Sequence, residues 1–360
     1  MRRSTKIAAV LAAATLALAG CAKDNKTSST GTSGNKPLDC SSTSGDGPKV
    51  GLAYDVGGQG DQSFNDSAAA GLKKAVADMS ATCTEGEAQD GEPESAREDR
   101  LRQMADAGDN PVIAVGFAYS ASIDAVAPDY PDTSFAVIDG FDPTPDKAND
   151  NVAYLGFAEN EGSFLVGVAA AENTKTDKIG FVGGVHVDLI KKFEAGYTAG
   201  AKAVNPNITV DVTYIEESNL KGFADPAGGK AAAAGLYDKG DDVVYQAAGG
   251  SGSGVFDAAV EAGDGKWAIG VDSDQYLTAS ADQKPHILTS MLKRVDVATY
   301  DMIQSVKDGS PLVSYQTYDL SKDGVGYATS GDFLSQSVQD DMNKYADQIK
   351  SGEIKVPTTP

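Results

Sequence analysis

The stretch KVGLAYDVGGQGDQSFN, residues 49–65, predicts a strand, a glycine-rich loop and the start of a helix. Residues 50–54 form a short apolar run, which is typical of a strand buried on both faces of a parallel sheet. Ligands of open α/β sheets bind beside the carboxyl ends of the strands. Asp55 at the end of this strand, and Asp61 and Phe64 beyond it, are therefore candidate ligand-binding residues.

Other interpretations of this loop stay open. Asp61 can cap the helix that follows, although Ser63 is the better-placed capping residue. Phe64 can be an ordinary core residue. The glycines do not form the G-x-G-x-x-G pattern of dinucleotide-binding loops, and no Walker lysine follows them. The loop thus predicts either a small-molecule site or a helix cap, without a dinucleotide motif.

Apolar strands alternate with amphipathic helices after this stretch. Further strands are expected at 111–116, 134–139, 152–157, 178–182, 208–214, 242–246, 266–271 and 286–291. Helices are expected at 94–107, 121–127, 160–172, 189–204, 224–238, 254–262 and 293–306. Such alternation predicts an α/β fold with parallel sheets covered on both faces.

The number of strands favours two doubly wound lobes over one large sheet, and 360 residues are enough for two domains. We expect lobe 1 to span 49–157, completed by about 273–310. We expect lobe 2 to span 158–272, completed by about 311–360. The last segment is expected to hold an edge hairpin around Gly324 and a terminal amphipathic helix.

The N-terminus predicts a lipoprotein signal peptide over residues 1–20. Three basic residues precede an apolar run at 7–19, which is too short to span a membrane. The run ends in Leu-Ala-Gly-Cys, a pattern that resembles the bacterial lipobox, in which the cysteine is lipidated. Cys21 would then anchor the protein to the outer face of a cell membrane; the alternative is an ordinary cleaved signal. Residues 21–48 are rich in Ser, Thr, Gly and Asn and predict a flexible tether.

The other two cysteines, Cys40 and Cys83, flank the first strand and helix. A strand–helix unit returns the chain to the sheet edge where the strand began, and export permits oxidation, so a disulfide between them is expected. Two cysteines with the distant His186 and His286 make a poor ligand set, so we expect no metal site.

The composition argues against two classes of function. With 52 acidic and 30 basic residues, the net charge is −22, which makes binding to a nucleic-acid backbone a poor hypothesis. The run GGSGSG at 249–254 does not fit the G-x-S-x-G nucleophile pattern, and we find no Ser-His-Asp arrangement. We expect neither catalysis nor a cofactor.

Polar residues follow several of the expected strands. Asp139 ends SFAVI, Asp272 ends AIGV, and a glycine run begins at position 249 after VVYQAA. Carboxylates can accept hydrogen bonds from a diol or from the edge of a base, and aromatic rings such as Phe193 offer flat apolar faces. Taken singly, each aspartate can also be a helix cap and each phenylalanine a core residue.

Five segments together resemble one family. They are KVGLAYDVGGQGDQSFN, KKFEAGY, QAAGGSGSGVFDAA, WAIGVDSDQ and TSMLKRVD, and they run in order from about Lys49 to Asp308. They are similar to signatures of the basic membrane protein family of lipoproteins, whose best-understood members are purine-nucleoside-binding components of ABC transporters. The resemblance implies a type I periplasmic-binding-protein fold, with two α/β lobes, a hinge of about three crossings and a ligand between the lobes.

The resemblance also implies roles for individual residues. Phe64 and Phe193 would sandwich the purine, and Asp55 and Asp61 would face the base edge. Asp272 and Lys293 would hold the ribose hydroxyls. The remaining candidates are Asn65 of the SFN segment, Gly250, which would allow close backbone approach, and Asp139 in the same cleft. Family members often have two acidic residues before SFN; Gly60 replaces the first here, which leaves the base preference open.

The expected function is therefore that of a lipid-anchored, extracytoplasmic solute-binding protein. It would capture a purine nucleoside (guanosine, inosine or adenosine) and deliver it to ABC permease subunits. The alternative is a surface sensor, adhesin or antigen that uses the same fold without transport.

Overall fold

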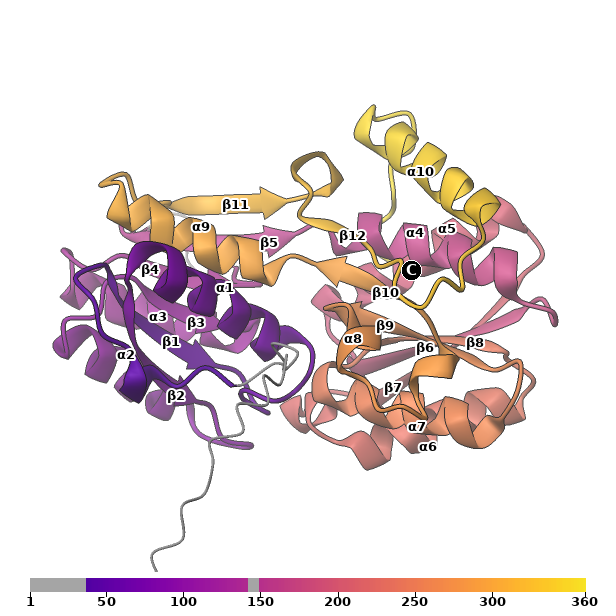
Figure 1. Ribbon diagram of the computed structural model, residues 1–360. Helices are drawn as coiled ribbons and strands as arrows, with labels where there is room; N and C mark the ends of the chain where they lie inside the picture. Colours follow the sequence, from indigo (N-terminus) through magenta and orange to yellow (C-terminus); the bar gives the residue numbers. More distant parts are fainter. Residues whose placement is uncertain (1–36, 142–148) are drawn as a thin grey trace, which may run out of the picture. The chain divides into compact units, whose positions relative to one another are not determined.

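The computed structural model describes residues 37–141 and 149–360, which form two six-stranded sheets with covering helices (Figure 1). The expected signal peptide, Cys21 and the tether up to residue 36 lie outside the described residues.

The first sheet has the strand order β11-β5-β4-β3-β1-β2, and all its pairs are parallel. Its strands are β1 (Lys49–Tyr54), β2 (Thr82–Glu87), β3 (Val112–Val115), β4 (Phe135–Ile138), β5 (Val152–Phe157) and β11 (Ser314–Tyr318). Helices α1 (Phe64–Met79) and α9 (Val295–Lys307) share one hydrophobic cluster, and α2 (Glu94–Asp106) and α3 (Ser120–Val126) share another. The sheet is thus covered on both faces, as the apolar run of β1 predicts.

The second sheet has the order β12-β10-β9-β8-β6-β7, with only β12 antiparallel to its neighbour among the described strands. Its strands are β6 (Lys178–Val185), β7 (Thr209–Glu216), β8 (Val243–Ala247), β9 (Trp267–Asp272), β10 (Ile287–Lys293) and β12 (Val325–Tyr327). The hydrophobic cluster that contains side chains of α1 and α9 continues here, with side chains of α4 (Glu159–Asn173), α5 (Asp188–Val204) and α10 (Gln336–Lys350). Another includes side chains of α6 (Pro226–Asp238) and α7 (Gly252–Ala262), and the short α8 (Gln275–Thr278) follows β9.

We call the first sheet with its helices lobe 1 and the second lobe 2. The chain passes between them after β5, after β10 and between β11 and β12. The expected boundaries are wrong in two places: β10 pairs with β9 in lobe 2, and β11 pairs with β5 in lobe 1. The expected hairpin around Gly324 is also wrong, because β11 and β12 belong to different sheets. Strand β2 was not predicted, because TCTEGE at the sheet edge lacks an apolar run.

The expected disulfide between Cys40 and Cys83 is confirmed. Its position follows from the parallel pairing of β1 and β2, which aligns Val50 with Cys83. The backbone just before β1 therefore lies beside the start of β2, and the N–H of Gly47 donates to the carbonyl of Ser80 over 3.0 Å.

Candidate ligand-binding site

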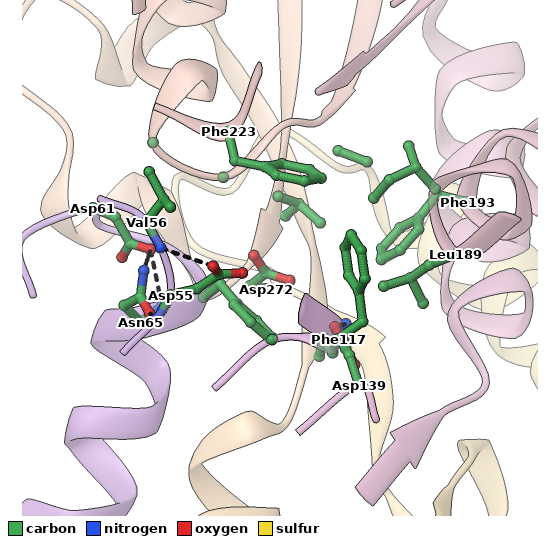
Figure 2. Close-up of a pocket in the computed structure, with 18 residues that line it drawn as sticks. Asp55, Val56, Asp61, Asn65, Phe117, Asp139, Leu189, Phe193, Phe223 and Asp272 are labelled. Carbon is green, nitrogen blue, oxygen red and sulfur yellow. Dashed lines mark hydrogen bonds and ion pairs between the residues drawn. The ribbon is translucent and has the colours of Figure 1, made fainter. Parts of the chain in front are cut away.

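A cavity of about 570 Å³, its open mouth included, is lined by side chains of both lobes (Figure 2). Lobe 1 contributes the ends of β1, β3 and β4 and the start of α1; lobe 2 contributes α5 and the ends of β8, β9 and β10. A mainly apolar lining with a few polar groups is typical of small-molecule pockets. All nine predicted ligand-binding residues line it: Asp55, Asp61, Phe64, Asn65, Asp139, Phe193, Gly250, Asp272 and Lys293.

Three aspartates reach the cavity from strand ends. Asp55 follows β1, Asp139 follows β4 and Asp272 is the last residue of β9. Asp139 (φ 60°) and Asp272 (φ 65°) have left-handed backbone conformations, which few residues other than glycine, asparagine and aspartate adopt readily. Sparsely populated conformations of this kind gather at functional sites, which makes both residues stronger candidates.

Asp61 lines the cavity, but its carboxylate is occupied by the start of α1. Its Oδ1 accepts bonds from the N–H groups of Ser63 (2.9 Å) and Asp66 (3.1 Å). Its Oδ2 accepts bonds from the N–H (2.8 Å) and the side-chain amide (3.0 Å) of Asn65. Four accepted bonds fill the capacity of a carboxylate. Asp61 therefore serves as the helix cap, and the expectation that Ser63 is the better cap is wrong, because its hydroxyl makes no capping bond.

Asn65 and Asp55 are linked through the same loop. The side-chain oxygen of Asn65 accepts the N–H of Asp55 over 3.0 Å, so both ends of the buried Asn65 amide are engaged within lobe 1. Asp55 Oδ1 accepts the N–H of Val56 over 2.8 Å. Its other oxygen lies against Gly116, where a Cβ atom would collide with it. Asn65 therefore braces the loop, and Asp55 keeps one oxygen without a hydrogen bond from the described residues.

Lys293 is buried between carboxylates of the two lobes. Its Nζ atom lies 2.5 Å from Asp139 Oδ2 in lobe 1 and 3.6 Å from Glu159 Oε1 in lobe 2. It also lies 5.0 Å from the ring centroid of Phe64 and 5.4 Å from that of Phe193. Burial lowers the pKa of Lys293, but the neighbouring carboxylates outweigh this and raise it overall. Lys293 is thus a cation at the junction of the lobes.

Asp272 is paired with a residue of the opposite lobe. Its Oδ2 atom accepts the hydroxyl of Ser63 over 2.5 Å, and both residues are buried. Burial raises the pKa of Asp272, while Lys293 and the Ser63 hydroxyl lower it and Asp139 raises it. The second oxygen makes no hydrogen bond with the described residues and is free to accept bonds from a ligand.

Aromatic rings surround the carboxylates. Phe64 and Phe193, both predicted, come from opposite lobes, and Phe117 and Phe223 were not predicted. Figure 2 shows the rings of Phe117, Phe193 and Phe223 facing the same space as Asp272. Phe117 directly follows Gly116 after β3. Its position at the end of a strand could therefore have identified it as a cavity residue from the sequence. Phe223 is the last residue of a short 3₁₀ helix after β7 (Leu220–Phe223), and no periodicity marks it.

The described part of the chain contains no group of three or more His, Cys, Asp or Glu side chains arranged to hold a metal ion. Nor, within the same residues, is any helix long and apolar enough to cross a membrane.

Replacing Asp55 with Asn should stabilise the ligand-free protein at pH 7.5 but not at pH 4. Burial raises the pKa of Asp55 to about 6 from an ordinary value of 3.8. A group whose pKa is raised by folding favours the folded state at low pH and loses that contribution as pH rises through about 4 to 6. The gain in unfolding free energy should reach up to about 3 kcal/mol above pH 7.

Urea unfolding of wild type and variant at the two pH values measures this difference. Asp90→Asn, on the exposed loop before α2, is the matched control and should show no such pH dependence. An Asp55→Asn effect that is the same at both pH values would contradict the prediction.

Comparisons with known proteins give the family of this chain. The family described as "ABC transporter substrate-binding protein PnrA-like" matches residues 49–360. The chain is 34% identical over 373 residues to "ABC transporter nucleoside-binding protein BmpA" of Lactococcus lactis subsp. cremoris, covering 99% of each chain. It is 37% identical over 324 residues to "CD4+ T-cell-stimulating antigen" of Listeria monocytogenes, covering 86% of this chain and 88% of the relative.

Solved structures show the same relationship. An ABC transporter solute-binding protein from Aeropyrum pernix K1 has a TM-score of 0.75 and 27% identity, covering 86% of this chain and 93% of that one. Another from Conexibacter woesei has a TM-score of 0.69 and 25% identity, covering 86% and 99%.

Proposed function

Since this chain belongs to the PnrA-like family of ABC transporter substrate-binding proteins, also represented by the basic membrane proteins, we propose that it binds a purine nucleoside between its lobes and delivers it to an ABC permease. Its fold is that of the type I periplasmic binding proteins. The name of the Lactococcus relative supports a nucleoside as the ligand class. The proposed activity is binding and delivery, with no bond made or broken.

The observation that carries the proposal is the combination of flat rings and carboxylates in one cavity. A purine nucleoside has a planar base and a sugar with vicinal hydroxyls. Aromatic faces suit the base, and a carboxylate with a free oxygen suits the hydroxyls. Phe64 and Phe193 flank the base in this proposal, while Asp272 holds the ribose.

The other cavity residues have supporting roles. Asp55 faces the edge of the base with its free oxygen. Asp61 and Asn65 hold the loop that carries Phe64, because their polar groups already bond within lobe 1. Lys293 and Asp139 complete the ribose end. Gly250 lets the backbone approach the ligand; a Cβ there would lie 3.3 Å from the Phe223 carbonyl oxygen and 3.7 Å from Asp61 Cβ, so the glycine keeps this narrow place clear.

Binding at this place favours closure of the lobes. A ligand that touches both lobes shifts the equilibrium toward the closed state by the difference in its affinity for the two states. Phe64 and Phe193 come from opposite lobes, so a base between them makes both contacts only when the lobes are closed. A permease that recognises the closed form would then receive loaded protein preferentially.

Mass spectrometry of small molecules released from the purified, denatured protein tests the proposal. We expect a purine nucleoside in the released fraction, and calorimetry of the refolded protein should give a single site per chain for that nucleoside. Release of another ligand class, with no heat from guanosine, inosine or adenosine, would overturn it.

A surface sensor or antigen without transport is the second candidate. The Listeria relative is named as an antigen, which supports this second function. Nucleoside uptake by cells that lack this protein separates the two functions, because only a transport role requires uptake to fall.

Membrane attachment through Cys21 completes the proposal. It rests on the basic residues, the short apolar run and the Leu-Ala-Gly-Cys sequence that precedes the tether. Replacing Cys21 with Ala should abolish lipidation and release the protein from the membrane fraction. Intact-mass measurement of the variant checks this, and lipid still attached to Cys21→Ala protein would place the anchor elsewhere.

A further inference from the structure

Ser63 stands at the N-cap position of α1 but makes no capping bond. Asp61 supplies the cap instead, because its carboxylate accepts the N–H groups at the start of the helix. The Ser63 hydroxyl is therefore available for another partner. It donates to Asp272 Oδ2 over 2.5 Å, from lobe 1 to lobe 2. Ser63 is fully buried and does not line the cavity, whereas Asp272 does.

Two further bonds hold the same turn against lobe 2. The carbonyl oxygen of Gln62 accepts the Gln275 side-chain amide over 3.0 Å, and that of Ser63 accepts the Ser273 hydroxyl over 3.3 Å. Gln62 has a left-handed backbone (φ 56°), which long side chains rarely adopt. The turn is thus fixed by groups on both lobes, with the Ser63 hydroxyl directed at the ligand-facing carboxylate.

We propose that Ser63 is a positioning residue, which orients the Asp272 carboxylate toward the ligand only when the two lobes are closed. This inference rests on the proposed function, because it assigns a ligand to the second oxygen of Asp272. Bonds from a hydroxyl to a carboxylate are stronger than those between neutral groups and fix its rotation. The closure of the lobes and the affinity for a ribose are then coupled through the Ser63 side chain, because opening of the lobes moves Ser63 away from Asp272.

The charged groups around Asp272 make this coupling measurable without a ligand. Lys293 at the end of β10 and Asp139 after β4 face it from the two lobes. Lys293 and the Ser63 hydroxyl both favour its ionised form. Loss of the hydroxyl should therefore move the titration of Asp272 to higher pH, a change that a general packing defect would not produce.

Calorimetry with inosine and hypoxanthine tests the positioning role. Ser63→Ala should weaken inosine binding about tenfold, as expected for loss of one bond to a charged group, and change hypoxanthine binding little. Ser273→Ala removes a bond between the lobes that does not involve Asp272, so its effect on inosine should be under about threefold. Thr278→Val is the matched control, because the Thr278 hydroxyl bonds within α8. Equal losses for both compounds, or for both serine variants, would overturn the proposal.

A titration decides the same question independently, in ligand-free protein whose lobes are held closed by a cysteine pair introduced across them away from the cavity, so that Ser63 and Asp272 stay in contact. Carbon-13 NMR of the Asp272 carboxyl group should show a higher pKa when Ser63→Ala is added to this closed protein. An unchanged titration sinks the role of Ser63 whatever the protein binds. Failure of wild type to bind inosine, with the titration shifted as expected, would instead count against the nucleoside and leave the Ser63–Asp272 contact supported.

Discussion

Replacing Lys293 with Met should lower the free energy of unfolding by about 3–5 kcal/mol, because it leaves two buried carboxylates without their cation. Lys293 is 2% exposed and lies between Asp139 and Glu159, whose side chains are also buried. Met fills a similar volume and packs well against aromatic rings, so the loss of charge dominates the effect. Urea unfolding of the ligand-free protein at pH 7 measures it.

Two variants control this experiment. Lys192→Met removes a lysine that is 37% exposed and lies 3.4 Å from the other oxygen of Glu159, so it should cost less than about 1 kcal/mol. Adding Asp139→Asn and Glu159→Gln to Lys293→Met should recover most of the lost stability, since no unpaired charge then remains. Lys293→Met protein as stable as wild type would show that the cation is not needed between the lobes.

Replacing Asp272 with Asn should weaken nucleoside binding at least about tenfold, since hydrogen bonds to a charged group contribute roughly 1.5–3 kcal/mol each. Asn is the suitable replacement because, unlike Ala, it tolerates the left-handed backbone at this position. Binding of the free base should barely change, because in the proposed binding mode Asp272 contacts only the ribose. Calorimetry with inosine and hypoxanthine gives both affinities, and Asp90→Asn is again the control.

Helix capping was the alternative role for Asp272, and the structure contradicts it. The short helix α8 has Asp274 at its N-cap position, and the carboxylate of Asp272 bonds Ser63 instead. Stability lost with nucleoside affinity intact would nevertheless remove Asp272 from the ligand site.

Local patterns predicted much of this fold and, together with the family resemblance, half of the residues that line the cavity. Buried parallel strands have a continuous apolar run that ends at the carboxyl edge, so a polar residue there, such as Asp55 or Asp139, already marks the site. The family resemblance added Lys293 and the pairing of Phe64 with Phe193. Phe117 follows a strand in the same way and could have been included.

What local patterns could not predict are contacts between distant segments. Ser63 and Asp272 are 209 positions apart, and Lys293 and Asp139 are 154 apart. Which carboxylate oxygen accepts which donor depends on how the two lobes pack against each other. The periodicity of apolar residues in the sequence carries no information about that packing. The assignment of β10 to a lobe failed for the same reason, because its apolar run fits either sheet equally well. β11 was misplaced because SYQTY, a mostly exposed edge strand, has no apolar run that links it to either sheet. Asp61 shows a related difficulty. An aspartate just before a helix can either cap the helix or contact a ligand, and the sequence looks the same in both cases.

The disulfide between Cys40 and Cys83 also determines where mechanical load travels. A pull on the chain before Cys40 passes through the two sulfur atoms directly into β2, so the backbone between the two cysteines is not stretched from end to end. That segment contains β1, the glycine-rich loop and the start of α1, with Asp55, Asp61, Phe64 and Asn65. A protein held by its N-terminal end against flow or wall movement would thus keep this side of its cavity undistorted, while the force is borne by a covalent bond and the edge strand.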